Sequence, residues 1–222
     1  MHFLCLHGRG TNAKIFEMQT AAIRYDLGEG HTYDFVEGSI PTEIDPGVKD
    51  MLAGNETGYV YFDENTPSSA LQALQNLDAY VELNGPYDGV IAFSQSVGLV
   101  GTWLVHRQRR NLPGVRCAVF LSGGSTALDP DVLSEGSMVP LSAGNVKLSE
   151  ILELPTAHIY GALDPHAPAA QEFSALCSDS LRSVFVHPGG HEVPGSGSGS
   201  SSKDVLNQAV NVVRRVVTLA RA

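Results

Sequence analysis

The chain has 222 residues, of which 43% are hydrophobic and 17% charged, a composition that supports a folded core and excludes disorder over most of its length. Fourteen Lys and Arg against 24 Asp and Glu give a net charge of −10, which argues against nucleic acid and against an anionic membrane surface as partners. No apolar run approaches the roughly 20 residues that span a bilayer, so we expect no membrane association.

The chain opens with an apolar run that predicts a buried strand and not a signal peptide, because it has no basic start and no small-residue cleavage site. The three cysteines, Cys5, Cys117 and Cys177, form no CxxC pair, so neither disulfides nor a metal site is expected. We therefore expect a reducing, cytoplasmic location.

Short apolar runs alternate with segments of helical periodicity along the whole chain. Such runs, bounded by Gly, Pro or Asp, suit strands buried on both faces of a parallel sheet. Strands are predicted at Phe3–Leu6, Tyr33–Val36, Val90–Phe93, Cys117–Leu121, His158–Tyr160 and Val184–Val186. Helices are predicted at 67–84, where Thr66 is a candidate cap, and at 95–108, 168–177 and 205–220. This order predicts one α/β domain over residues 1–222, with helices on both sides of a mainly parallel sheet.

Two stretches break the alternation. Residues 38–66 are rich in Gly, Pro, Asp, Glu and Asn and predict a long irregular connection, which in a compact domain is usually functional or disordered. Its aromatic residues Tyr61 and Phe62 are candidates for the wall of a substrate pocket, and packing of the connection is the alternative. Residues 195–202 are Gly and Ser alone and predict a flexible loop without chemistry.

A serine, Ser94, stands between the predicted strand that ends at Phe93 and the predicted helix 95–108. This layout is typical of a nucleophile elbow, in which the positions two before and two after the serine are small, commonly Gly. Here they are Ala92 and Ser96, the next smallest choices, so the strict pattern is not met. Ser94 is a candidate nucleophile, and the alternative is a serine that only caps the helix.

Two backbone N–H groups are candidates for stabilising an oxyanion. The N–H of Gln95 lies at the start of a predicted helix and would face the developing charge. His7-Gly8-Arg9-Gly10 follows the first strand, where hydrolases with such an elbow take a second donor from a His-Gly-rich loop. The N–H of Arg9 is therefore the second candidate, and a simple Gly-rich turn is the alternative.

A carboxylate and a histidine follow Ser94 in the chain order Ser…Asp…His that α/β-hydrolase triads have. Asp164 comes just after the fifth predicted strand, and His191 lies on a Gly-Gly loop after the sixth. The loop would be free to swing over Ser94, which makes His191 the preferred base and Asp164 the preferred acid.

Two other residues remain open for these roles. His187 ends its strand but is followed at once by Pro188, which makes it the second choice for the base. Asp129 follows the Cys117–Leu121 strand after a Ser-Gly-Gly loop and is the second choice for the acid.

Four segments together resemble the fungal serine hydrolase family, compact α/β-hydrolases related to the acyl-releasing thioesterases of fungal polyketide clusters. The segments are His7-Gly8, Ala92-Phe93-Ser94-Gln95-Ser96, Gly161-x-x-Asp164 and Gly189-Gly190-His191-Glu192-Val193-Pro194. Family members usually carry Gly-Phe-Ser-Gln-Gly at the elbow, so Ala92 and Ser96 depart from the family pattern. The resemblance implies an α/β-hydrolase fold with a minimal lid, in which Ser94 is the nucleophile, Asp164 the acid and His191 the base.

The leading hypothesis is a serine hydrolase that cleaves an acyl thioester or ester through an acyl-enzyme and needs neither a metal nor an organic cofactor. Its substrate would be a small molecule or an acyl group on an acyl carrier protein, and the resemblance implies release of a polyketide or fatty acyl chain in secondary metabolism. The acidic balance counts against docking of a carrier that is itself acidic. The alternatives are a small-ester carboxylesterase and a non-catalytic binding protein that retains the fold.

Overall fold

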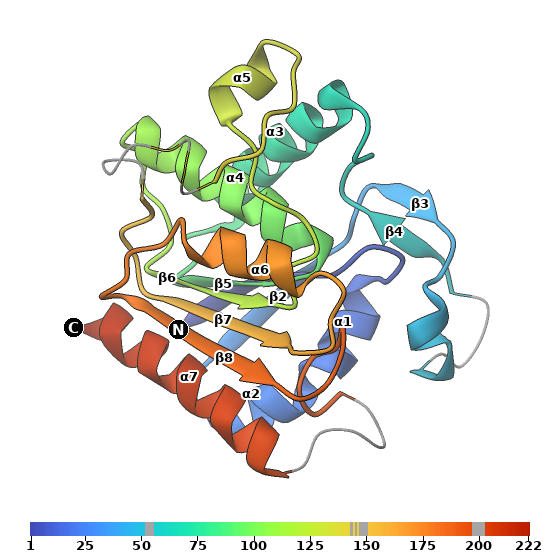
Figure 1. Cartoon of the computed structure of the whole chain (residues 1–222), viewed down its shortest axis with the longest axis vertical. Helices are drawn as coiled ribbons and strands as arrows, with labels where there is room; N and C mark the ends of the chain where they lie inside the picture. The colour runs from blue at the N-terminus through green and yellow to red at the C-terminus, as the bar shows by residue number, and fades with distance from the viewer. Residues whose placement is uncertain (52–55, 143, 145, 147–150, 197–202) are drawn as a thin grey trace.

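A six-stranded sheet forms the centre of the computed structural model, which describes residues 1–51, 56–142, 144, 146, 151–196 and 203–222. The strand order is β2-β1-β5-β6-β7-β8, and every neighbouring pair is parallel (Figure 1). All six predicted strands are confirmed, and five of them are one to three residues longer than predicted. They are β1 (His2–Leu6), β2 (Thr32–Val36), β5 (Gly89–Phe93), β6 (Cys117–Leu121), β7 (Thr156–Gly161) and β8 (Arg182–His187).

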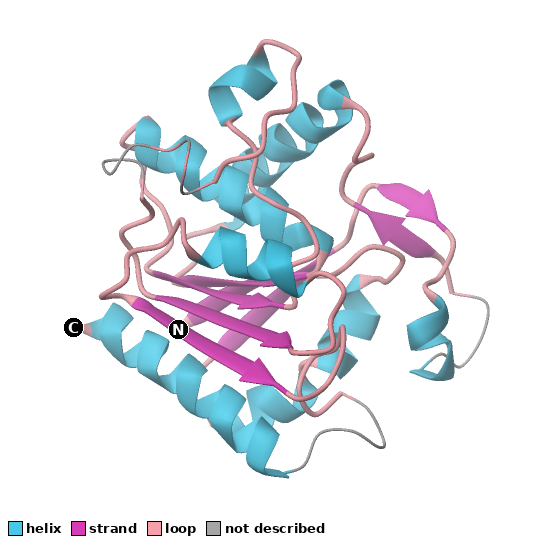
Figure 2. Cartoon of the chain, in the orientation of Figure 1, coloured by secondary structure: helices cyan, strands magenta, loops and turns pink. Residues whose placement is uncertain are grey.

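Helices cover both faces of this sheet (Figure 2). They are α1 (Ala13–Gln19), α2 (Ala21–Leu27), α3 (Pro67–Asn84), α4 (Gln95–Arg109), α5 (Pro130–Ser134), α6 (Ala167–Ser174) and α7 (Lys203–Arg221). Helices α1, α2 and α7 pack on one face, while α3, α4 and α6 pack on the other. Thr66 precedes α3 as predicted, but its hydroxyl donates to Asp63 Oδ2 at 2.9 Å and does not cap the helix.

Two hydrophobic cores result from the alternation of side chains along the buried strands. Successive residues of a strand point to opposite faces. Leu4 and Leu6 of β1 therefore join the core beneath α3 and α4, whereas Phe3 and Cys5 join the core beneath α7. Because both faces are apolar, the central strands appear in the sequence as continuous apolar runs.

The segment 38–66 is more regular than the predicted irregular connection. It contains the antiparallel pair β3 (Ile40–Thr42) and β4 (Gly58–Val60) and the 3-10 helix η1 (Pro46–Met51), which lie beside the main sheet (Figure 1). Strands of three residues are too short to show an alternating pattern, and one of these contains a proline. That prediction was therefore wrong for this part of the segment.

The carboxyl ends of β1, β5, β6, β7 and β8 meet at one edge of the sheet. Their register brings Leu6 beside Ala92, Phe93 beside Leu121, and Gly161 beside His187. Every predicted site residue follows one of these ends except Tyr61 and Phe62, which follow β4. Residues 197–202 of the predicted Gly/Ser loop lie outside the described residues. None of the described helices combines the length and the apolar character that crossing a membrane requires.

Candidate active site

Ser94 occupies a sharp turn between β5 and α4. Its backbone has φ 57° and ψ −117°, a conformation that residues with a side chain avoid and that costs about 1–3 kcal/mol. Contacts to the last residue of β6 and to the loop after it stabilise the turn: the N–H of Ser94 donates to Leu121 O, and the N–H of Gly124 donates to Ser94 O, both at 3.1 Å. The half-buried serine thus stands at the carboxyl edge of the sheet in the geometry of an elbow.

The two departures from glycine fit within this turn. Ala92 and Ser96 are both completely buried. The Ser96 hydroxyl accepts a hydrogen bond from the N–H of Phe93 at 3.0 Å and lies 2.8 Å from Leu6 O and 2.9 Å from Phe93 O, to which it can donate. Ser96 therefore links the elbow to the end of β1, a contact that glycine could not make.

A continuous hydrogen-bond relay connects Ser94 with a histidine and a buried carboxylate. His191 Nε2 lies 2.9 Å from Ser94 Oγ, and His191 Nδ1 lies 2.8 Å from Asp164 Oδ2. The Asp164 carboxylate has no exposed surface, and its second oxygen accepts the N–H of His166 at 2.8 Å. Because an ionised carboxylate only accepts, the proton of a neutral His191 belongs on Nδ1, which leaves Nε2 able to accept the serine proton.

The loop that carries His191, which the sequence predicts to be free to swing, makes several contacts with the rest of the structure. The N–H of Leu163, beside the acid, donates to Gly189 O at 3.0 Å, and the Ser122 hydroxyl donates to Glu192 O at 3.1 Å. Val193 is completely buried beneath the loop. These contacts hold the imidazole in place over Ser94.

His187 and Asp129, the second choices for base and acid, have other partners. His187 is buried, which lowers its pKa, and its Nδ1 accepts the N–H of Gly189 at 3.2 Å. Asp129 pairs with Arg109 through both oxygens, at 2.9 and 3.1 Å, and caps α5 through the N–H groups of Asp131 and Val132. Burial alone would raise the pKa of Asp129, but these hydrogen bonds outweigh it and lower the pKa.

The loop after β1 lies directly against the elbow. A Cβ atom added to Gly8 would lie 3.0 Å from Ser94 Cβ, so only glycine allows this close approach. Gln95 directly follows Ser94 in the chain, and Arg9 directly follows Gly8. No acceptor for the backbone N–H of either residue is found in the part of the chain that the structure describes. Both therefore remain available for an oxyanion.

The side chain of Gln95 has a second role that the sequence did not reveal. Its Oε1 accepts the N–H of Tyr61 at 3.1 Å, and its Nε2 donates to Phe62 O and to Glu64 Oε1, both at 3.1 Å. The elbow thereby holds the segment that follows β4. In the sequence, the one sign of this role is that a polar residue directly follows the candidate nucleophile. A polar residue is equally expected at the exposed start of any helix, so the sequence does not distinguish the two.

Gly124, a close neighbour of the serine, forms part of the wall of an open hollow of about 560 Å³. A Cβ atom added to Gly124 would approach Ser94 Oγ to 2.8 Å. Phe62, Met138 and Pro140 line the hollow, as do the polar side chains of Glu64 and Ser125.

Of the two aromatic candidates for the pocket wall, only Phe62 is among the described residues that line this hollow. The Tyr61 hydroxyl instead donates to Val36 O at 2.8 Å and accepts the N–H of His7 at 3.0 Å. Tyr61 thus connects β4 to the ends of β1 and β2. Among the described residues, no group of three or more His, Cys, Asp and Glu side chains is arranged to hold a metal ion.

A family model and two similar proteins that match this chain carry hydrolase or esterase names. A family model described as "Serine hydrolase (FSH1)" matches residues 1–202. The esterase FPY3 of Fusarium mangiferae is 31% identical over 229 aligned residues, which cover 99% of this chain and 98% of that protein. The hydrolase phiM of Fungal sp. (strain ATCC 74256) is 31% identical over 198 residues, which cover 87% of this chain and 86% of that protein.

Solved structures agree in fold. The crystal structure of Arabidopsis thaliana SOBER1 matches with a TM-score of 0.58 at 16% identity and covers 98% of this chain and 99% of that chain. The esterase PE8 matches with a TM-score of 0.54 at 17% identity, over 97% of this chain and 92% of that chain. At such identities the likeness concerns the fold alone, and it confirms the predicted α/β-hydrolase class.

Proposed function

The chain belongs to the FSH1 serine hydrolase family and is a hydrolytic enzyme, and we propose that it cleaves acyl esters or thioesters with Ser94, His191 and Asp164 as its catalytic triad. The observation that carries the proposal is the unbroken relay of 2.9 and 2.8 Å on a strained elbow. A serine that only capped a helix would require neither the strain nor the buried carboxylate.

In the proposed reaction, His191 Nε2 takes the proton of Ser94 as Oγ attacks the carbonyl carbon. Asp164 orients the imidazole and stabilises its cationic form without itself becoming protonated. The N–H groups of Arg9 and Gln95 stabilise the oxyanion, and one such donor is worth about 2.7–4 kcal/mol. His191 then gives its proton to the leaving alcohol or thiol, and water releases the acid from the acyl-enzyme. The chemistry needs no metal and no organic cofactor.

We assign the acyl group of the substrate to the hollow beside Gly124. Phe62, Met138 and Pro140 give it an apolar surface, and Glu64 gives it a polar edge. The names of similar proteins, an esterase among them, favour an oxygen ester over a thioester. Release of a polyketide or fatty acyl chain is the more specific form of this proposal.

An acyl carrier protein is the weaker choice of substrate carrier. The arginines that could attract an acidic carrier, Arg107, Arg109 and Arg110, form ion pairs with acidic residues of this chain. Their partners are Asp78, Glu82, Asp129 and Asp131, at 2.6–3.3 Å. We therefore propose a small-molecule ester as substrate, in a reducing compartment such as the cytoplasm, where the three buried thiols would stay free.

The proposal is tested by labelling with a fluorophosphonate probe and by kinetics on p-nitrophenyl esters and acyl thioesters of matched chain length. We expect Ser94→Ala to abolish labelling and to lower kcat at least about 10⁴-fold. Ser180→Ala, which changes an exposed serine, is the matched control and should behave as the native protein does. A folded native protein that is not labelled would refute the catalytic role of Ser94. Equal or better turnover of thioesters would refute the ester preference.

A further inference from the structure

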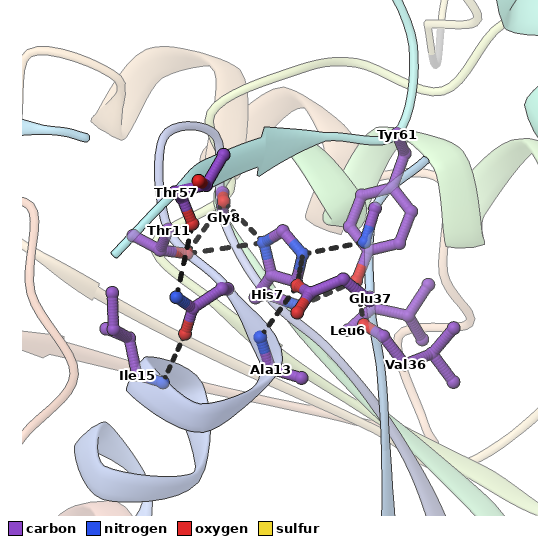
Figure 3. Close-up of polar contacts among 12 residues, drawn as sticks. Leu6, His7, Gly8, Thr11, Ala13, Ile15, Val36, Glu37, Thr57 and Tyr61 are labelled. Atoms are coloured by element: carbon purple, nitrogen blue, oxygen red, sulfur yellow. Dashed lines mark hydrogen bonds and ion pairs between the residues drawn. The ribbon is translucent and has the colours of Figure 1, made fainter. Parts of the chain in front are cut away.

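His7 is a fully buried histidine that the proposed mechanism does not use (Figure 3). It directly follows β1, and its ring packs against that of Tyr61, with 4.8 Å between the centroids. Its Nδ1 lies 2.7 Å from Gly8 O. Its Nε2 accepts the N–H of Gly38 at 2.9 Å and lies 3.1 Å from Glu37 Oε1.

The position of one ring proton follows from these partners whichever charge the ring carries. With a neutral ring, the proton belongs on Nδ1, because the Gly8 carbonyl oxygen 2.7 Å away can only accept, and Nε2 then accepts from Gly38. With a charged ring, Nε2 donates to Glu37 and Nδ1 is still protonated. Since the carbonyl of Gly8 can only accept, His7 Nδ1 donates to it in both states.

Gly8 O receives two more hydrogen bonds, both from one residue. The Thr11 hydroxyl donates at 2.8 Å and the Thr11 N–H at 3.3 Å, so residues 8–11 form a tight turn (Figure 3). Gly10 has φ 67°, as the third residue of a type II turn requires. Three donors therefore fix the direction of the Gly8 carbonyl.

The carbonyl of Gly8 and the N–H of Arg9 belong to the same peptide unit. A trans peptide is planar, so its N–H points opposite to its C=O, and fixing one fixes the other. The Gly8 carbonyl points at the buried His7 ring, and Gly8 lies so close to Ser94 that a Cβ atom added to it would be 3.0 Å from Ser94 Cβ. We propose that the Arg9 N–H faces the site from the opposite side of this peptide and that His7 is a positioning residue that, with Thr11, aims it at the oxyanion; this rests on the proposed function.

The test compares His7→Asn with His7→Gln, because the two amides replace different ring nitrogens. The Asn amide can donate from the position of Nδ1, whereas the Gln amide reaches only the position of Nε2. We expect His7→Gln to lower kcat about 10- to 100-fold with little change in KM, and to weaken a trifluoromethyl ketone inhibitor by the same factor. His7→Asn should stay within about threefold of the native kcat, although it loses the contact to Gly38 and should melt as early as His7→Gln.

A second pair keeps the proposal testable if His7→Gln does not fold. Thr11→Val removes the hydroxyl at constant shape and should lower kcat about 3- to 10-fold, whereas Thr11→Ser keeps the donor and should match the native enzyme. Equal kcat values within each pair, or losses that follow melting temperature or KM alone, would overturn the role of His7 and Thr11 while leaving the triad intact. A native protein that neither turns over esters nor labels at Ser94 would instead refute the proposed function, and this inference with it.

Discussion

At the scale of single residues, Ser94 holds a backbone conformation that favours glycine, and contacts from other elements stabilise it. The sequence raises the question whether Ala92 and Ser96 disturb this turn. In the structure both side chains are buried, and the Ser96 hydroxyl binds the backbone at the ends of β1 and β5. At Ser96, the side chain that replaces the usual glycine therefore makes stabilising hydrogen bonds, and at Ala92 the methyl group is accommodated in the core.

We expect Ser96→Ala to lower the free energy of unfolding by about 1–3 kcal/mol, because it leaves buried backbone groups without their partner. Urea denaturation measures the difference. Ser134→Ala, which truncates an exposed serine on α5, is the matched control and should change stability by less than about 0.5 kcal/mol. Equal stability of the two variants would contradict the role assigned to Ser96.

Substitution by Asn is expected to affect different properties at the two candidate acids: activity at Asp164 and stability at Asp129. Asp164→Asn should lower kcat about 10⁴-fold, because an amide favours the wrong tautomer of His191. Asp129→Asn should lose about 1–3 kcal/mol of stability with its Arg109 pair and keep kcat within about twofold. Ester kinetics and urea denaturation of both variants distinguish the assignments, and a large loss of kcat in Asp129→Asn would reverse them.

At the scale of elements, the segment after β2 and the loop after β1 form one assembly beside the sheet. The N–H of Gly10 donates to Tyr59 O at 3.0 Å, and the N–H of Tyr59 donates to Thr11 O at 2.8 Å. Gln95 then ties the residues that follow β4 to the start of α4. The segment thus supports the loop that carries Arg9, in addition to contributing Phe62 to the hollow.

Gln95→Met keeps the shape of the side chain but removes all three of its hydrogen bonds. We expect a loss of about 2–3 kcal/mol in the free energy of unfolding and faster hydrogen exchange of the Tyr61 amide, which loses its acceptor. Gln108→Met, on the exposed end of the same helix, is the control and should leave this amide unchanged. An unchanged exchange rate at Tyr61 in Gln95→Met would show that the contact does not hold the segment.

At the scale of the whole molecule, the dependence of stability on pH follows from how deeply the fold buries its histidines. His158 on β7 is completely enclosed, in contact with the rings of Phe120 and Phe173. Burial lowers its pKa from 6.5 to about 3. Below pH 6.5 the unfolded chain therefore binds a proton that the folded chain does not, so stability falls as the pH falls.

We expect His158 to contribute a loss of about 1.6 kcal/mol in the free energy of unfolding between pH 6.5 and pH 5, with a slope that approaches about 1.4 kcal/mol per pH unit as the unfolded histidine becomes fully protonated. Urea denaturation of the native protein and of His158→Gln across this range measures the contribution as the difference between their slopes. Parallel slopes would mean that His158 is protonated in the folded protein as readily as in the unfolded one.

The sequence by itself determined the six strands, the four longest helices and the order of Ser94, Asp164 and His191, because each depends on local periodicity or on turn chemistry within a few residues. It left Asp129 and His187 open, and it did not reveal the pair β3–β4. The surroundings of these residues and the position of this strand pair depend on contacts between residues far apart in the chain, such as Arg109 with Asp129 and Gln95 with Tyr61. Only the tertiary structure shows these contacts, because a hydrogen bond between distant segments produces no periodic pattern in the sequence of either segment.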